Sequence, residues 1–385
     1  MLRTKAARQA QKIGLLVSER YFQSFGDRLL ANGDAVDFIV MPRQTNTAKY
    51  LSYDSRNVLP PEDLDRITCG FASSDMESDW DTMLCFMGAL ERAPNLRWLQ
   101  ISWVGVDFPF VRPLLETATN TKRFVVTNAA GTNAPPIATS VMAGMLALHR
   151  RLNLLLRAQV EHRWVDKRDM PRREDIQGKT ALIFGFGAIG QRVGALCRAF
   201  DMNVVGVQRS APDEKALAAA NEIVHPDDLA SAITTADFCV IACPLTEETE
   251  GKFDREMLAR MKPDSFLLNV GRAAVVDEEA LLDCLRVGAR RLPKAIFSGG
   301  GGADDEDEGG GGGGGIAGAY IDVFSTEPLP ASSELWRLPN VIVSPHDSQS
   351  CVDNDARVHR IFRENLRRFA CGDDEKLTNQ VWPYT

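Results

Sequence analysis

The chain of 385 residues carries 44 lysines and arginines against 52 aspartates and glutamates, a formal net charge of −8. This balance argues against a nucleic-acid surface, because phosphate backbones require clustered cations. With 44% hydrophobic residues the chain can bury a large core, which excludes disorder as its main state. The length predicts two domains or one large α/β unit.

Eight cysteines are present without a CxxC pair, so neither a zinc spacing nor a disulfide framework is visible. We expect no metal site and small buried thiols. The apolar stretch 141–148 is well short of the roughly 18 residues that a membrane span requires, and no secretory segment opens the chain. These features predict a soluble, cytoplasmic protein without membrane contact. Four basic residues within positions 1–12 leave organellar targeting open.

One segment distorts the composition. Residues 298–315 hold eleven of the 30 glycines and five consecutive acids. Such a segment cannot bury apolar surface and has high backbone entropy, so we predict a disordered insertion over 293–315. An acidic docking tract for a partner is the alternative.

Apolar runs alternate with helical stretches in two series. The first starts at Ile13 and the second at Thr180, and their further runs lie at 38–41, 67, 96–102, 203–207, 238–243, 265–270, 317–324 and 340–345. This alternation predicts parallel sheets covered by helices on both faces. Between the two series, Pro135 and Pro136 introduce one long helix over 137–158. The last helix, about 351–369, is expected to return to the first domain.

The segment GFGAIG places Gly185, Gly187 and Gly190 directly after a predicted strand and at the start of a helix. In a dinucleotide-binding turn the first glycine permits the tight turn, and the second lets a pyrophosphate approach the backbone. The third lets the helix and strand pack closely. This context predicts a dinucleotide site rather than a merely structural turn.

The following strand ends at Gln208, Arg209 and Ser210. NAD-specific folds usually place an acid there, which binds the ribose 2′-hydroxyl. No carboxylate stands in this segment to repel a 2′-phosphate, and Arg209 and Ser210 can bind one. We therefore predict a preference for NADPH, with a tolerant NAD site as the alternative.

Arg272, Glu327 and His346 each follow a predicted strand, at the carboxyl ends where open parallel sheets bind their ligands. Reduction of a 2-oxo acid needs a cation for the carboxylate, a proton donor for the carbonyl oxygen and a hydride source. Arg272 offers a bidentate fork, and His346 can donate the proton if Glu327 orients its ring. Taken singly, each residue is better explained by an ordinary position: Arg272 as a surface charge, Glu327 as a turn acid and His346 as a loop histidine.

The blocks GFGAIG, ACPLTEET (242–249), NVGRAAVVDEEAL (269–281), AGAYIDVFSTEPLP (317–330) and LWRLPNVIVSPH (335–346) together resemble the D-isomer-specific 2-hydroxyacid dehydrogenases, in particular their glyoxylate/hydroxypyruvate reductase-like members. The resemblance covers most of residues 90–370. It implies an α/β fold with two doubly wound parallel-sheet domains. A Rossmann-type NAD(P)-binding domain, 137–347, would be inserted in a flavodoxin-like substrate domain of 1–136 plus 348–385. A homodimer formed through the 137–158 region is also implied.

The resemblance also assigns roles to residues. In that family the arginine of NVGR binds the substrate carboxylate, the glutamate pairs with the histidine, and the histidine is the acid/base, which here implies Arg272, Glu327 and His346. The implied coenzyme contacts are Gly185, Gly187, Ala188, Ile189, Gly190, Gln208, Arg209, Ser210, Cys243, Pro244, Thr249, Val270, Gly271 and Asp322. The implied substrate contacts are the backbone of Phe71, Ala72, Ser73 and Ser74, together with Arg272.

The implied activity is the reduction of a small 2-oxo acid, such as glyoxylate or hydroxypyruvate, to the D-2-hydroxy acid with NADPH or NADH. Phosphoglycerate oxidation and a non-catalytic, dinucleotide-sensing protein of the corepressor type stay open as alternatives. The sequence departs from the family at Ala273, at Asp347-Ser348 and at Thr139, where a glycine, a small apolar residue with a glycine, and a glutamate are usual. The first adds a methyl group near the pocket, and the second adds a charge beside the nicotinamide.

Overall fold

The computed structural model describes residues 13–30, 36–44, 58–76, 78–105, 111, 114–117, 124–293, 315–373 and 376–382. Its contacts divide the chain into unit 1, residues 1–132 and 352–385, and unit 2, residues 133–351. The boundaries predicted from the sequence, 136/137 and 347/348, each lie four residues from this division. Residues 294–314 of the predicted insertion lie outside the described residues.

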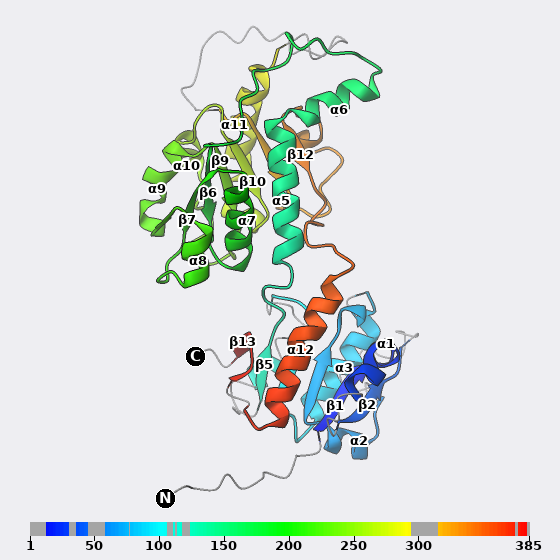
Figure 1. The fold of residues 1–385 in the computed structure, drawn as a ribbon. Helices are drawn as coiled ribbons and strands as arrows, with labels where there is room; N and C mark the ends of the chain where they lie inside the picture. The colour runs from blue at the N-terminus through cyan, green and yellow to red at the C-terminus, as the bar shows by residue number, and fades with distance from the viewer. Residues whose placement is uncertain are drawn as a thin grey trace, which may run out of the picture. The chain divides into compact units, whose positions relative to one another are not determined.

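Unit 1 contains a sheet whose described strands follow the order β13-β5-β4-β3-β1-β2 (Figure 1). They are β1 (Ile13–Ser18), β2 (Val36–Met41), β3 (Cys69–Ala72), β4 (Trp98–Ile101), β5 (Val125–Thr127) and β13 (Gln380–Trp382). Neighbours are parallel except β13, which pairs antiparallel with β5. Because β1 and β3 are parallel neighbours, the segments that follow Ser18 and Ala72 emerge side by side.

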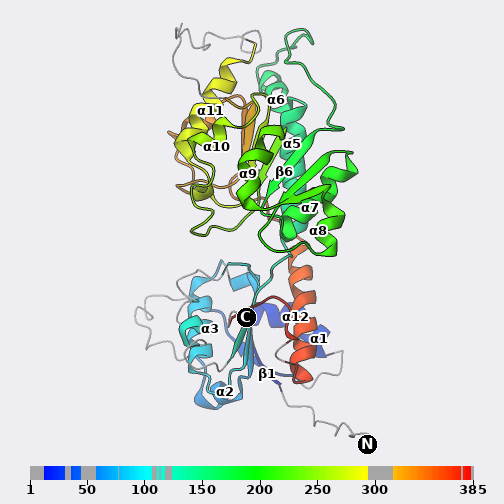
Figure 2. The same ribbon diagram turned by 90° about the vertical axis from the view of Figure 1, so that its left-hand side faces the viewer.

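Alternate strand residues of unit 1 face two helix layers. Leu15 and Trp98 pack with α1 (Glu19–Leu30) and α12 (Asn354–Ala370), whereas Leu16 and Leu99 pack with α3 (Trp80–Arg92). Figure 2 shows α1 and α12 on one side of the sheet, and α2 (Pro61–Arg66) and α3 on the other. The apolar residues of α12 recur at helical spacing and are buried in this core: Val358, Phe362, Leu366 and Phe369. The last helix thus returns to the first sheet, as predicted.

Unit 2 contains a fully parallel sheet whose described strands follow the order β12-β11-β10-β9-β6-β7-β8. They are β6 (Thr180–Phe184), β7 (Asn203–Val207), β8 (Glu222–Val224), β9 (Phe238–Ile241), β10 (Phe266–Asn269), β11 (Gly318–Ile321) and β12 (Val341–Val343). The strands β5, β8 and β13 were not predicted from the sequence. Each has only three residues, too few for a clear periodic signal.

Helices cover both faces of the second sheet. One face packs against α5 (Ala134–His149), α7 (Ala188–Ala199) and α8 (Glu214–Ala219), and the other against α9 (Leu229–Ala232), α10 (Arg255–Ala259) and α11 (Glu278–Arg290). Three of these helices, α8, α10 and α11, begin at an aspartate whose side chain accepts a hydrogen bond from a backbone N–H three residues later: Asp213, Asp254 and Asp277. Such caps fix where each helix begins and leave the preceding loop at the sheet edge.

The prediction of one helix over 137–158 is wrong. The chain forms α5 and a separate helix, α6 (Leu152–Val160). Arg151 between them has a φ of 58°, a left-handed conformation that interrupts the helical hydrogen-bond ladder. Its guanidinium carbon lies 5.2 Å from the centroid of the Phe266 ring. No helix within the described ranges is long and apolar enough to cross a bilayer.

Phe362 is the central residue between α12 and the first sheet. It is fully buried, and its ring centroid lies 4.3 Å from that of Phe71 and 5.6 Å from that of Trp98. We expect Phe362→Ala to lower the free energy of unfolding of unit 1 by about 3–5 kcal/mol, because it removes a packed ring and leaves a cavity. Urea denaturation followed by circular dichroism measures the loss. Arg360→Ala, exposed on the same helix, is the control; an equal loss in both variants would contradict the packing argument.

Candidate functional site

The glycine turn joins β6 to α7, and its three glycines have different surroundings. Gly185 has a φ of 95°, and a Cβ there would lie 2.5 Å from the backbone nitrogen of Cys243. A Cβ on Gly190 would lie 2.3 Å from the Gly185 carbonyl oxygen. A Cβ on Gly187 would meet no atom of the described residues within 4 Å. The first and third glycines therefore close the turn, whereas the second faces open space at the N-terminus of α7, which fits a pyrophosphate on the backbone.

The other predicted coenzyme contacts also lie at strand ends or at the start of α7. Ala188 and Ile189 form the first turn of α7, and Val270 and Gly271 follow β10. Cys243, Pro244 and Thr249 belong to the loop after β9, where Thr249 Oγ1 donates to the Pro244 carbonyl oxygen at 2.8 Å. Burial raises the pKa of the Cys243 thiol to about 11. This thiol is therefore protonated at neutral pH and is not a nucleophile.

The segment after β7 carries the predicted ribose contacts, Gln208 to Ser210. The Gln208 side chain donates to the Ser210 carbonyl oxygen at 2.9 Å, and Arg209 and Ser210 are exposed. Arg209 Nη1 lies 2.7 Å from Oε2 of Glu248, which comes from the loop after β9. The segment itself carries no carboxylate, as the sequence indicated, but an acid distant in sequence lies beside Arg209.

Arg272, Glu327 and His346 follow β10, β11 and β12, three adjacent strands of one sheet. The structure brings Glu327 and His346 into direct contact, with 2.7 Å between Oε2 of Glu327 and Nδ1 of His346. Arg272 is exposed, and its Nη1 donates to the Gly271 carbonyl oxygen at 2.9 Å. It lies close enough for its charge to act on the Glu327 carboxyl. Glu327 and His346 are thus paired within unit 2, and Arg272 follows the neighbouring strand of the same sheet.

The Glu327 carboxylate orients the imidazole. Partial burial raises its pKa, but the hydrogen bond with His346, the hydrogen bond from the Phe324 backbone N–H at 2.9 Å and the Arg272 charge together bring the pKa below its usual value. The carboxyl is therefore ionised at neutral pH. Because it occupies Nδ1 of His346, the second ring nitrogen, Nε2, is left to exchange a proton with a ligand.

His346 lies on a tightly held loop. Its φ is 54°, a left-handed conformation that is uncommon outside glycine. The Asp322 carboxylate, 1% exposed, accepts hydrogen bonds from Ser344 Oγ and Ser348 Oγ at 2.5 Å each and from the Asp347 backbone N–H at 3.0 Å. Asp322 therefore anchors the loop on both sides of the histidine. Its predicted role as a coenzyme contact stays a prediction.

The anchoring serines were not predicted from the sequence. Ser344 and Ser348 lie two residues before and two residues after His346, and this symmetrical spacing is a signal that could have indicated them. The side chain of Asp347, expected beside the nicotinamide, accepts a hydrogen bond from Ser350 Oγ. Thr139 Oγ1 donates to the Pro135 carbonyl oxygen at 2.9 Å within α5, and Ala273 begins a short 3₁₀ turn after Arg272.

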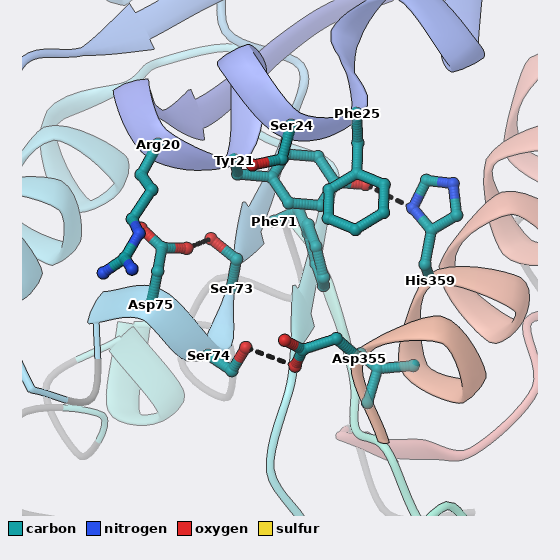
Figure 3. Close-up of a pocket in the computed structure, with 11 residues that line it drawn as sticks. Arg20, Tyr21, Ser24, Phe25, Phe71, Ser73, Ser74, Asp75, Asp355 and His359 are labelled. Atoms are coloured by element: carbon teal, nitrogen blue, oxygen red, sulfur yellow. Dashed lines mark hydrogen bonds between the residues drawn. The ribbon is translucent and has the colours of Figure 1, made fainter. Parts of the chain in front are cut away.

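The predicted substrate loop, Phe71 to Ser74, belongs to unit 1. It borders a cavity of about 450 Å³ at the carboxyl ends of β1 and β3 (Figure 3). Ser73 Oγ donates to Asp75 at 2.5 Å, and Ser74 Oγ donates to Asp355 at 2.6 Å. The side chain of Phe71 is buried in the core, and Ala72 is fully buried, so a ligand could meet these two residues through their backbone. Contact of this loop with substrate stays a prediction.

Aromatic side chains form one side of the same cavity. Burial raises the pKa of Tyr21, so its hydroxyl stays protonated, and it is hydrogen-bonded to Nδ1 of His359 at 2.7 Å. The Phe25 ring stacks on the His359 ring with centroids 4.6 Å apart (Figure 3). The cavity thus has an aromatic side from α1 and α12 and a hydroxyl-rich side from the segment after β3.

The described part of the chain was predicted to have buried thiols and no metal site. No group of three or more histidine, cysteine or acidic side chains there is placed to hold a metal ion. The eight cysteines are free thiols. Six are buried, as predicted, but Cys351 and Cys371 are exposed, so the prediction is wrong for these two.

Comparison with known sequences gives three findings. Residues 142–292 and 313–348 match the profile of the NAD binding domain of D-isomer specific 2-hydroxyacid dehydrogenases. Glyoxylate/hydroxypyruvate reductase B of Pectobacterium carotovorum is 33% identical over 259 residues, which cover 67% of this chain and 70% of that protein. D-3-phosphoglycerate dehydrogenase of Methanocaldococcus jannaschii is 30% identical over 284 residues, 74% of this chain and 47% of that protein. The chain therefore spans about half the length of this dehydrogenase.

Solved structures show the same fold. A D-isomer specific 2-hydroxyacid dehydrogenase family protein from Aeromonas salmonicida superposes with a TM-score of 0.66 at 26% identity, covering 96% of this chain and 99% of that one. A relative from Xanthobacter autotrophicus, crystallised with NADPH and MES, gives a TM-score of 0.67 at 23% identity, with 97% and 98% covered, and supports the fold alone. The predicted class, two parallel-sheet α/β domains of which one is a Rossmann-type NAD-binding domain, is confirmed.

We expect alanine to have different effects on stability and on dinucleotide binding at the middle glycine of the turn and at an outer one. Gly187→Ala should leave the melting temperature unchanged, since its Cβ would have no atom of the described residues within 4 Å. It should weaken dinucleotide binding by at least about tenfold, because the methyl group occupies the space of the pyrophosphate. Isothermal titration calorimetry with NADPH and NADH and a thermal melt measure both. Gly190→Ala is the matched comparison and should lower the melting temperature. Undiminished binding by Gly187→Ala would contradict the assigned role.

Proposed function

The chain belongs to the D-isomer specific 2-hydroxyacid dehydrogenase family, and from this premise we propose that it reduces a small 2-oxo acid to the D-2-hydroxy acid with a nicotinamide dinucleotide. The observation that carries the proposal is the Glu327–His346 pair, together with the placement of Arg272 after the neighbouring strand of the same sheet. The same sheet carries the glycine turn whose open middle position fits a pyrophosphate. We propose glyoxylate or hydroxypyruvate as the substrate type.

The residues divide the chemistry among them. When bound, the coenzyme supplies the hydride. The Arg272 guanidinium binds the substrate carboxylate through two parallel hydrogen bonds. His346 donates the proton on Nε2 to the carbonyl oxygen as the hydroxyl forms. The hydrogen bond between the Glu327 carboxylate and Nδ1 keeps the imidazole ring in place during this transfer.

We propose NADPH as the preferred coenzyme, with NADH as the alternative. Arg209 and Ser210 are exposed at the end of β7, where a 2′-phosphate of the adenosine ribose would be bound. Neither residue is acidic. A guanidinium is well suited to a phosphate because its planar donors match two phosphate oxygens.

The activity is tested by a panel of glyoxylate, hydroxypyruvate and pyruvate with each coenzyme, followed at the nicotinamide absorbance. We expect turnover by the wild-type chain and a loss of about 10²–10⁴-fold in kcat for His346→Gln, because general acid catalysis is removed while the other binding groups remain. His225→Gln, an exposed histidine in the same unit, is the control and should keep the wild-type rate.

The outcomes separate the proposed enzyme from its alternatives. Tight coenzyme binding without turnover of any 2-oxo acid would support the dinucleotide-sensing protein instead. The similarity to phosphoglycerate dehydrogenases makes oxidation of 3-phosphoglycerate a second candidate, so this compound belongs in the panel with the oxidised coenzyme. An unchanged kcat in His346→Gln would reject the acid/base role.

We also propose that the protein is a homodimer that uses α6. Large apolar side chains recur at every fourth position along this helix and just beyond it, and all are exposed: Leu152, Leu156, Val160 and Trp164. Exposed apolar side chains at helical spacing, as at Leu152, Leu156 and Val160, are typical of a protein interface. The second copy would bury them through a two-fold symmetrical contact.

Two charges among these side chains should prevent the dimer. We expect the wild-type chain to have twice the protomer mass in light scattering after size-exclusion chromatography, and Leu156→Glu with Val160→Glu to have the protomer mass, since both charges would be desolvated at the interface. Leu217→Glu, an equally exposed apolar residue on α8, is the control and should keep the dimer. A dimer that survives the double substitution would exclude α6 as the interface.

A further inference from the structure

The Arg209–Glu248 ion pair spans the glycine turn. Arg209 follows β7 and Glu248 lies in the loop after β9, and these strands are the two neighbours of β6, which carries the turn. Their side chains meet with 2.7 Å between Nη1 and Oε2. The pair therefore lies where the protein would contact the 2′ position of the adenosine ribose in a bound dinucleotide.

A hydrogen bond within the loop after β9 places Glu248, but the ion pair itself contributes little to the stability of the fold. Thr246 N donates to Thr249 Oγ1 at 2.8 Å, which holds the turn that carries Glu248. The two side chains are 66% and 67% exposed. Exposed ion pairs of this kind add little to stability, so the pair can open when a ligand arrives.

An arginine paired with an acid offers a polar contact to each of the two coenzymes, NADPH and NADH. A ribose 2′-hydroxyl can donate to the Glu248 carboxylate, which supplies the acceptor that the end of β7 lacks. A 2′-phosphate can bind Arg209, but it must share the guanidinium with Glu248 and lie beside its negative charge. Like charges a few ångströms apart in water repel by an amount that corresponds to about a fivefold change in affinity.

We propose that Glu248 is a coenzyme-specificity residue that weakens the selection of a 2′-phosphate by Arg209 and makes the 2′-hydroxyl form acceptable. This inference rests on the proposed coenzyme binding. It goes beyond it by assigning the balance between the two coenzymes to an acid outside the strand that usually carries the ribose-reading residue.

The test measures binding rather than turnover. The full-length chain is titrated by calorimetry with 2′,5′-ADP, which carries the 2′-phosphate, and with 5′-AMP, which carries the free 2′-hydroxyl. We expect Glu248→Gln to bind 2′,5′-ADP about five- to tenfold more tightly and 5′-AMP a few-fold more weakly. Arg209→Ala should lose at least about tenfold in affinity for 2′,5′-ADP and keep its affinity for 5′-AMP.

Glu247→Gln is the matched control, because it removes the same charge from the neighbouring exposed residue. The ratio of the two affinities should change in Glu248→Gln and stay near the wild-type value in Glu247→Gln. Equal ratios in all three proteins, or weaker 2′,5′-ADP binding by Glu248→Gln, overturn the role of Glu248 alone. A wild-type chain that binds neither fragment nor NADPH nor NADH overturns the proposed coenzyme binding as well.

Discussion

The buried carboxylate of Asp322 is the constraint on which the arrangement around His346 depends. A carboxylate with 1% exposure is stable only when its oxygens are paired, and here two serine hydroxyls and a backbone N–H from the segment 344–348 provide the partners. The same bonds hold both ends of a short loop, so that the histidine between them keeps a left-handed conformation that would otherwise relax. The imidazole is thereby presented to Glu327 without reorganisation, which is a requirement for efficient proton transfer.

A second constraint acts through backbone atoms. The glycine turn packs so closely on the start of the loop after β9 that a Cβ on Gly185 would lie within 2.6 Å of two backbone atoms of Cys243. This close approach fixes the turn against the loop that carries Glu248. The Arg209–Glu248 distance is therefore set by three consecutive sheet positions rather than by the flexible side chains alone. The backbone thus keeps both residues beside the turn, whereas their exposed side chains can separate to bind a ligand.

Features repeated over several residues could be predicted from the sequence. The glycine turn, the alternating strand series and the return of the last helix all follow from such patterns. Features that depend on a single residue or on a distant partner could not be predicted from the sequence. The break at Arg151 leaves the apolar periodicity intact and depends on one backbone angle, and β13 is stabilised by pairing with β5, more than 250 residues earlier in the chain. Glu248 was missed for the same reason, since its meeting with Arg209 depends on the order of strands in space. The contact between Glu327 and His346, by contrast, was predicted from chemistry and lies at 2.7 Å.

The His346 imidazole lies beside the negative Glu327, and the positive Arg272 follows the next strand. This arrangement of charges affects the proposed reaction. Partial burial of Glu327 raises its pKa, yet its hydrogen bonds and the nearby Arg272 lower it overall, so the carboxyl stays ionised as the pH falls towards the range in which free carboxyls protonate. An ionised Glu327 keeps the hydrogen bond with Nδ1 that fixes the orientation of the imidazole ring. Arg272 thus acts twice in the proposed chemistry. It offers its guanidinium to the substrate carboxylate, and its charge adds to the hydrogen bonds that keep Glu327 ionised.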